Sequence, residues 1–120
     1  MAEINSVDTT DFTVVNSKMP YLDAFLMEIN RLYPTVHATV RVMNREHPLR
    51  VNDNVVTLKP GMVLFVNYYH LHTSPKYWGV DAGEFVPERF IGGYDKEQPF
   101  MAFGYGPRSC VSCPFPSFPI

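Results

Sequence analysis

The sequence predicts a mixed α/β fold in which one helix is followed by a small sheet and then by a long loop-rich segment. Apolar residues recur at helical spacing between residues 20 and 33 and predict the helix. Stretches rich in β-branched residues between residues 36 and 69 predict the strands. From residue 77 to residue 107, six glycines and three prolines predict irregular backbone. So long an irregular segment in a compact domain is usually functional or disordered.

Size and composition restrict the class of protein. A chain of 120 residues is enough for one small domain. The net charge of −2 and the absence of a basic run argue against nucleic acid as a partner. No apolar run approaches the roughly 20 residues of a membrane-spanning helix, and the polar segment Met1–Thr10 is no signal peptide. Because Cys110 and Cys113 are too few for a disulfide framework, we expect a reducing compartment.

The predicted helix has a clear beginning and end. Pro20 suits the first turn, where its missing N–H costs nothing, and Pro34 ends the helix because the residue before a proline avoids helical geometry. Ala24 and Met27 lie opposite the main apolar stripe and beside Arg31, so we expect both sides of the helix to be covered. The stripe consists of Leu22, Phe25, Leu26, Ile29, Leu32 and Tyr33.

The sheet is predicted from three segments. Val36–Met43 reads as a strand, and Asn52–Asn54 separates residues 49–51 from residues 55–58 as the turn of a hairpin. Met62–Tyr69 is mostly apolar and predicts a buried strand.

Charged residues on the helix form the first candidate for a functional group. Glu28 and Arg31 are three residues apart, and a surface pair of this kind contributes only about 0.2–0.5 kcal/mol. The apolar residues behind the helix suggest instead that the pair is enclosed, and a buried pair must be fully hydrogen-bonded. Arg89, in the turn-like segment Pro87–Phe90, could be the further partner that such a pair requires.

The second candidate is the loop that ends at Cys110. Gly104, Gly106 and Pro107 specify a tight loop whose backbone can approach a ligand closely. Arg108, two residues before the cysteine, favours the thiolate form, which is the form that binds metals. The alternative is an inert cysteine that follows a turn.

Three motifs together resemble the C-terminal signatures of cytochromes P-450. They are the helix E-x-x-R (Glu28, Arg31), the P-E-R-F element (Pro87–Phe90) and the loop F-x-x-G-x-R-x-C (Phe103–Cys110), in the family's order. The first two motifs are weak alone, whereas the loop is fairly specific.

The resemblance covers most of the chain, from about Lys18 to Val111. The stretch His72–Phe90 looks most like fungal members. The implied fold is a truncated C-terminal portion of the P-450 architecture, with the E-x-x-R helix, a small β-sheet, a loop-rich meander and a haem-binding loop.

The resemblance implies haem b as the cofactor, with iron held by the Cys110 thiolate. Thiolate ligation pushes electron density toward the iron and favours O–O cleavage. Phe103 would pack on the proximal face of the haem and shield the sulfur. Gly104 and Gly106 would shape the loop, and the N–H groups after Cys110 would point at the sulfur and help to set the redox potential.

The resemblance also assigns roles to the basic residues. Arg108 and Arg41 would pair with the haem propionates, because charge-assisted pairs of this kind are strong and directional. Glu28, Arg31 and Arg89 would form a triad with a structural role, not a catalytic one.

By resemblance, the activity is monooxygenation of a small organic substrate, with electrons from an NADPH-cytochrome reductase or an equivalent donor. Eukaryotic relatives are usually anchored to the endoplasmic reticulum. The family's A-G-x-x-T element, which delivers protons, is absent. We therefore expect an incomplete domain over residues 1–111, with little or no turnover of its own.

Residues 112–120 are predicted to be an unrelated tail. The family has a glycine two residues after the ligand, followed by a long helix, whereas this chain has Ser112 and then a proline-rich segment that cannot be helical. Val-Ser can be encoded by GTAAGT, a common intron start. One alternative is therefore an inactive fragment, from mis-splicing or a pseudogene.

A second alternative is a small metal or redox module built on Cys110 and Cys113. A single C-x-x-C is a weak signal, because tetrahedral zinc requires four ligands. The histidines do not add any: His37 and His47 lack metal-ligand spacing. His70 and His72 are expected to be partly exposed on one side of a strand end.

Overall fold

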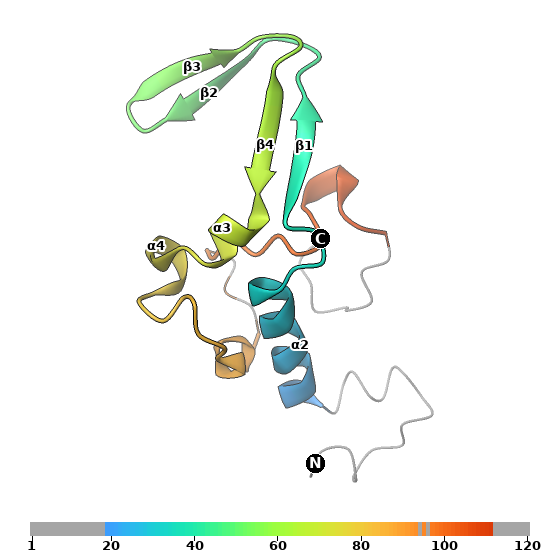
Figure 1. The fold of residues 1–120 in the computed structure, drawn as a ribbon, viewed down its shortest axis with the longest axis vertical. Coiled ribbons are helices and arrows are strands. Elements are labelled where there is room, and N and C mark those ends of the chain that lie inside the picture. The colour runs from blue at the N-terminus through green and yellow to red at the C-terminus, as the bar shows by residue number, and fades with distance from the viewer. Residues whose placement is uncertain (1–18, 94, 96, 112–120) are drawn as a thin grey trace.

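The computed structural model describes residues 19–93, 95 and 97–111, and they form the mixed α/β arrangement that the sequence predicts (Figure 1). A helical body lies at one end, and a β-ribbon leads away from it. The elements in chain order are α2 (Pro20–Leu32), β1 (Ala38–Val42), β2 (His47–Val51), β3 (Asn54–Leu58), β4 (Val63–Asn67), α3 (Tyr68–His72), α4 (Pro75–Trp78), η2 (Pro87–Phe90) and η3 (Gly106–Arg108).

Helix α2 has the predicted bounds but not the predicted coverage. It begins at Pro20 and ends at Leu32, and the Tyr33 N–H caps it by donating to the Ile29 carbonyl at 2.7 Å. The side that carries Ala24 and Met27 is buried, as expected. On the apolar stripe, however, Phe25 is 37% exposed and Tyr33 is 70% exposed. Because Leu32 on the same stripe is buried, coverage of both sides of the helix is confirmed only in part, and the described residues pack mainly against the Ala24 side.

The strands form two separate antiparallel ladders (Figure 1). In one ladder β1 pairs with β4, with Ala38 opposite Asn67. In the other, β2 and β3 form the predicted hairpin, with Val51 opposite Asn54. Asn52 in the turn has a φ of 53°, a left-handed conformation that asparagine tolerates better than most residues.

The prediction of a buried strand over Met62–Tyr69 was wrong in extent and in burial. Strand β4 ends at Asn67, whose side-chain oxygen accepts a hydrogen bond from the His70 N–H at 3.0 Å and so caps α3. Val63 and Phe65 are 65% and 66% exposed. The reason is that β4 pairs only with β1, and no second layer of described residues covers this face.

Two short helices that were not predicted from the sequence lie just before the loop-rich segment and at its start. Helix α3 has five residues and α4 has four, which is too short for a periodic signal. From α4 onward the described chain consists of turns and the two 3₁₀ segments η2 and η3, as expected. None of the described helices is long and apolar enough to cross a bilayer.

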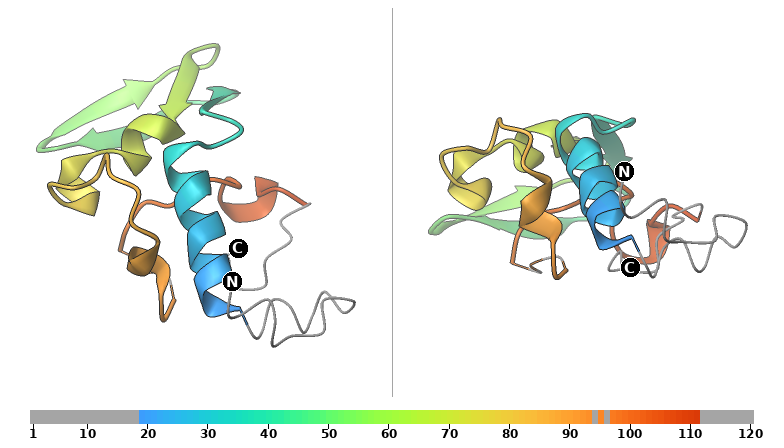
Figure 2. Two further views of the ribbon diagram at one scale, coloured as in Figure 1. Left: turned by 60° about the horizontal axis from the view of Figure 1, so that its bottom comes forward. Right: turned by 90° about the horizontal axis from the view of Figure 1, so that it is seen from below.

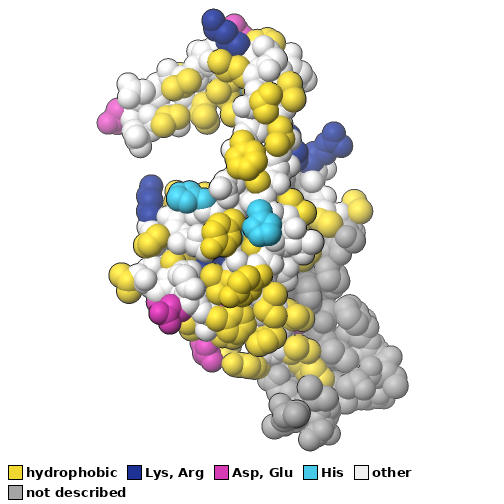
Figure 3. Space-filling view, in the orientation of Figure 1, with side chains coloured by type: hydrophobic (Ala, Val, Ile, Leu, Met, Phe, Trp, Pro, Cys, Tyr) yellow, Lys and Arg dark blue, Asp and Glu magenta, His cyan; other side chains and the backbone are white. Residues whose placement is uncertain are grey.

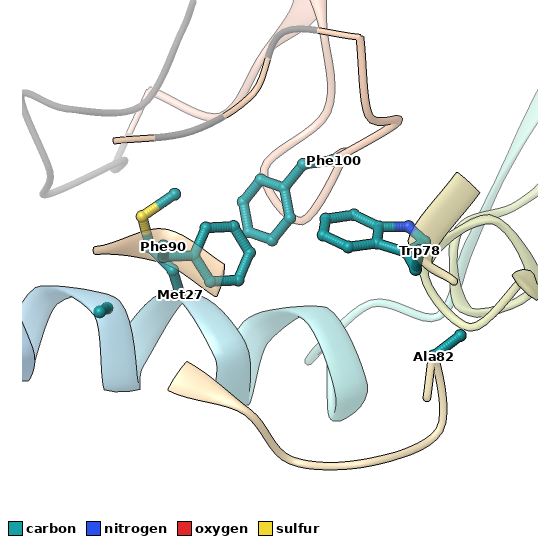
Figure 4. Close-up of a cluster of buried hydrophobic side chains, with 6 residues drawn as sticks. Met27, Trp78, Ala82, Phe90 and Phe100 are labelled. Carbon is teal, nitrogen blue, oxygen red and sulfur yellow. The ribbon is translucent and has the colours of Figure 1, made fainter. Parts of the chain in front are cut away.

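One aromatic cluster joins α2 to the segments that follow it in sequence (Figure 4). The Phe90 and Phe100 rings meet edge to face at 5.5 Å, and the Trp78 and Phe90 rings lie 5.9 Å apart. Such pairs contribute beyond their buried area. Figure 2 shows the chain from η2 to η3 passing from one flank of α2 to the other. The cluster comprises Ala24, Met27, Trp78, Ala82, Phe90 and Phe100.

Candidate functional site

Glu28 and Arg31 form a completely buried ion pair, each with 0% of its side chain exposed. The guanidinium donates two hydrogen bonds to the carboxylate, from Nε at 2.7 Å and from Nη2 at 2.8 Å, one to each oxygen. Arg31 Nη1 also donates to the carbonyls of His72 and Ala82, each at 2.6 Å. Nη2 donates to the Glu84 carbonyl at 2.9 Å. The pair therefore fastens α2 to α3 and to the segment before η2.

Arg89 approaches the same carboxylate without completing a hydrogen bond to it. Its Nε lies 3.6 Å from Glu28 Oε1, which counts as an ion pair but is too long for a hydrogen bond. This Nε is buried, and no described residue accepts a hydrogen bond from it. Glu28 Oε1 instead accepts from the Val86 N–H at 2.8 Å. The structure thus brings Glu28, Arg31 and Arg89 together, with Arg89 held to Glu28 by charge alone.

The two Nη atoms of Arg89 are hydrogen-bonded to the end of α4 and to the segment that follows it. Its Nη1 donates to the Trp78 carbonyl at 3.2 Å, and its Nη2 donates to the Asp81 carbonyl at 3.0 Å. The Asp81 carboxylate pairs with Nη2 as well. The hydrogen bond from Arg89 lowers the pKa of Asp81 below its ordinary value, so this carboxylate remains ionised near neutral pH.

His72 is buried, contrary to the expectation of a partly exposed residue at a strand end. Its side chain is completely enclosed, and its ring stacks on Phe100 with centroids 5.4 Å apart. The prediction failed because residues 68–72 form helix α3, not a strand. Tyr68 and His72 are four apart and share the inner face of one helical turn, but one such pair is too short a pattern to predict a helix.

The His72 ring makes two hydrogen bonds that fix its protonation. Nε2 lies 2.8 Å from the Met101 backbone nitrogen, which can only donate, so Nε2 must be the acceptor. Nδ1 therefore carries the proton and donates to the Arg31 carbonyl at 3.1 Å. Burial lowers the pKa of His72 to about 4, and the positive charge of Arg31 acts in the same direction. The ring is neutral at pH 7.

The cysteine loop is tight, as predicted. The Cys110 N–H donates to the Phe103 carbonyl at 2.8 Å, and the Gly104 N–H donates to the Met101 carbonyl at 3.0 Å. Gly104 and Gly106 have φ values of 77° and 75°, a region that favours glycine. These bonds hold the loop in a form that leaves Cys110 exposed.

A pocket of about 400 Å³ gathers most of the residues predicted to contact a cofactor. Cys110, Phe103, Gly104 and Arg108 line it from the loop, and Arg41 lines it from β1, whereas Gly106 does not. Arg41 Nη1 donates to Thr39 Oγ1 at 2.9 Å. The lining residues that the sequence analysis missed are Asn30, Thr35, Val36, Thr39, Tyr68 and Ala102.

The residues of this pocket fit a haem. Cys110 offers a thiolate, which iron accepts as an axial ligand. Arg41 and Arg108 are the charged side chains of the described lining, and both suit carboxylates such as propionates. Phe103 and Val36 add apolar surface for a flat ring. No cluster of three or more His, Cys, Asp and Glu side chains exists among the described residues, and Cys113 lies outside them.

Comparison with known proteins identifies the family. The model of the family "Cytochrome P450" matches residues 8–115, so the chain belongs to the cytochrome P450 family. Human cytochrome P450 3A5 is 35% identical over 100 residues, which are 82% of this chain and 19% of that protein. Cytochrome P450 72A68 of Medicago truncatula is 34% identical over 113 residues, 91% of this chain and 21% of that protein.

A solved structure agrees with this assignment. A zebrafish cytochrome P450 in a structure with abiraterone has a TM-score of 0.71 and 28% identity, over 94% of this chain and 27% of that chain. This chain spans about a fifth of the length of the curated relatives it matches. The fungal resemblance, the division at residue 111 and the roles of the site residues stay predictions.

Proposed function

We propose that this chain supplies the thiolate side of the haem site of a cytochrome P450 monooxygenase, with Cys110 as the axial ligand of haem b. The observation that carries the proposal is the pocket, which joins Cys110 to Phe103 and to the two arginines Arg41 and Arg108. Bound haem would supply the redox chemistry that places one oxygen atom of O₂ in a small organic substrate and releases the other as water. An NADPH-cytochrome reductase or an equivalent donor would provide the electrons.

The chain's own residues act on the ligand sulfur and on the carboxylates of the cofactor. Arg108 and Cys110 line the same pocket, where the positive charge of Arg108 would favour the thiolate over the thiol. Phe103 contributes its backbone carbonyl to the Cys110 N–H and lines the pocket with its ring. Arg41, whose Nη1 is bonded to Thr39, is positioned to pair with a propionate.

A haem titration tests this proposal with matched variants. Arg41→Gln removes one of the two lining cations, and we expect haem affinity to fall about tenfold, the usual scale for a charge-assisted pair. Arg50→Gln is the control, because Arg50 is exposed on β2 and does not line the pocket. Equal affinities of the two variants would contradict the assignment of Arg41.

We further propose that the isolated chain turns over little or no substrate. Cys110 is exposed in the described structure, whereas efficient oxygen activation requires a closed and dry site. With a reductase and NADPH supplied, we expect product formation no faster than with haem in solution. Product formation well above that level would show that this stretch of chain is enough for catalysis.

A further inference from the structure

His72 and Arg31 form two reciprocal hydrogen bonds near the end of α2. The Arg31 guanidinium donates to the His72 carbonyl at 2.6 Å, and the His72 ring returns a hydrogen bond to the Arg31 carbonyl at 3.1 Å. Both side chains are completely buried. Nδ1 of the ring is therefore bonded to α2, and the other ring nitrogen, Nε2, points to the segment that leads to Cys110.

Nε2 is the start of a continuous series of contacts that reaches the predicted haem ligand. It accepts from the Met101 N–H at 2.8 Å, and the Met101 carbonyl accepts from the Gly104 N–H at 3.0 Å. One residue before Gly104, the Phe103 carbonyl accepts from the Cys110 N–H at 2.8 Å. The His72 ring also stacks on Phe100, which adds an apolar contact at the start of the segment that leads to Cys110.

We propose that neutral His72 is a positioning residue for the segment from Phe100 to Cys110, and that protonation of its Nε2 releases this segment from α2. For the loop itself the proposal depends only on the described contacts. Its consequence for the cofactor, a misplaced Cys110 sulfur, depends also on the function proposed above.

The charges around His72 oppose its protonation in place. From α2, the positive guanidinium of Arg31 opposes a second charge on the ring, and the Glu28 carboxylate is hydrogen-bonded to that guanidinium. Phe100 and Met101 bring no charge from the loop side. A proton on Nε2 would place a second cation near Arg31 and would set one donor against the Met101 N–H. The other titratable groups on the neighbouring elements are Tyr68, Tyr69 and His70 on α3, Lys76 and Tyr77 on α4, Asp81 and Glu84 after it, and Arg89 on η2.

Amide exchange at Met101 measures this contact directly. In the haem-free chain labelled with ¹⁵N-methionine, the Met101 amide should be protected to a constant degree above pH 6.5. A released His72 ring would bind a proton below its ordinary pKa of 6.5, whereas burial lowers the pKa of the bound ring to about 4. Between pH 6.5 and pH 4 the protection should therefore fall by up to about tenfold for each pH unit. Met27 in α2 is the internal control, and it should stay more protected than Met101 at every pH, because its amide exchanges only when α2 opens.

Two variants separate positioning from mere packing. His72→Gln keeps an acceptor oxygen near the position of Nε2 but cannot titrate, so Met101 protection should be retained and should not change across this pH range. His72→Leu removes the acceptor, and Met101 should exchange about tenfold faster at pH 7, because a partly buried donor is left without its bond. His70→Gln is the matched control, since His70 is exposed on the same helix.

The cofactor is examined in a separate arm. With haem added, the thiolate absorption of the wild-type chain should be lost over the same pH range and retained in His72→Gln. If the wild-type chain takes up no haem while Met101 behaves as described, the proposed function fails and the positioning role stands. A wild-type Met101 protection that ignores pH between 6.5 and 4, or one equal to that of Met27 at every pH, would overturn the positioning role.

Discussion

At the scale of single residues, the carboxylate of Glu28 is completely buried and requires partners for its charge and its hydrogen bonds. It accepts two hydrogen bonds from Arg31 and one from the Val86 N–H, and it lies 3.6 Å from Arg89 Nε. A buried ion pair is tolerated when its hydrogen bonds are complete, and loss of one partner leaves an uncompensated charge. The Glu28–Arg31 pair therefore serves mainly to hold α2 against α3 and the segment before η2, and adds little net stability.

Glu28→Gln tests the structural role of the Glu28–Arg31 ion pair. The variant leaves the Arg31 guanidinium buried without its counter-charge, so we expect a loss of about 3 kcal/mol or more in the free energy of unfolding. Urea denaturation measures the loss. Glu46→Gln is the control, because Glu46 is exposed and should change stability by less than about 0.5 kcal/mol. Similar losses in the two variants would contradict the structural role of Glu28.

His72 makes the stability of the chain depend on pH. Its pKa is lowered to about 4 in the folded chain from an ordinary 6.5, so the unfolded chain binds more protons between these values. Its contribution is complete above pH 6.5 and is lost as the pH falls toward 4, by about 3 kcal/mol in total. Asp81, whose pKa is also lowered, loses its contribution only at lower pH, below its ordinary value of 3.8.

Urea denaturation at several pH values tests this dependence. The wild-type chain should lose stability steadily from pH 6.5 to pH 4, and His72→Gln should lose less over the same interval. Parallel curves for the two proteins would show that other groups cause the acid sensitivity.

At the scale of elements, the sequence was most informative where one residue fixes the backbone. Pro20 and Pro34 bracket α2, and the Asn52–Asp53 turn sets the register of β2 and β3. Helix α3 was missed because five residues give no periodic signal, and the burial of His72 was missed with it. The exposure of β4 could not be foreseen, because an apolar strand looks the same whether or not a second layer covers it.

Gly104 tests the backbone of the cysteine loop. A Cβ there would lie 3.6 Å from Ser109 Cα, which is ordinary contact, so strain at its φ of 77° is the obstacle. We expect Gly104→Ala to lower the stability of the loop by about 1–2 kcal/mol and to weaken haem binding. Gly83→Ala is the control, since a Cβ at Gly83 meets nothing within 4 Å and its φ is not positive. Thermal unfolding and haem titration would contradict this if both variants behaved alike.

At the scale of the whole molecule, the described residues divide into a packed body and a projecting ribbon. The described part of the chain extends over 55 × 32 × 20 Å, with a radius of gyration of 17.4 Å, whereas a compact domain of this size would have no more than about 14 Å. Figure 3 shows apolar side chains along the ribbon. On its strands, Val40, Val55 and Phe65 are exposed. The pocket lies where the two parts meet, with Arg41 from the ribbon and Cys110 from the loop beside the body.

The family could be predicted from the sequence because its motifs are separate in the chain and specific in combination. Glu28 and Arg31 meet Arg89, as the resemblance implied, and the cysteine loop shares a pocket with Arg41. The wall of that pocket could not be predicted. Asn30 and Val36, for example, line it only because α2 ends where it does and the chain turns into β1.

The most direct measurement is the absorption spectrum of the reduced, haem-loaded chain with carbon monoxide, recorded for the wild type, Cys110→Ser and Cys113→Ser. If Cys110 holds the iron as a thiolate, the wild type and Cys113→Ser will share a strongly red-shifted Soret band that Cys110→Ser lacks. Loss of that band in Cys113→Ser would point to a site that needs both thiols. A wild-type spectrum without the red-shifted band would contradict the assignment of Cys110 as the haem ligand.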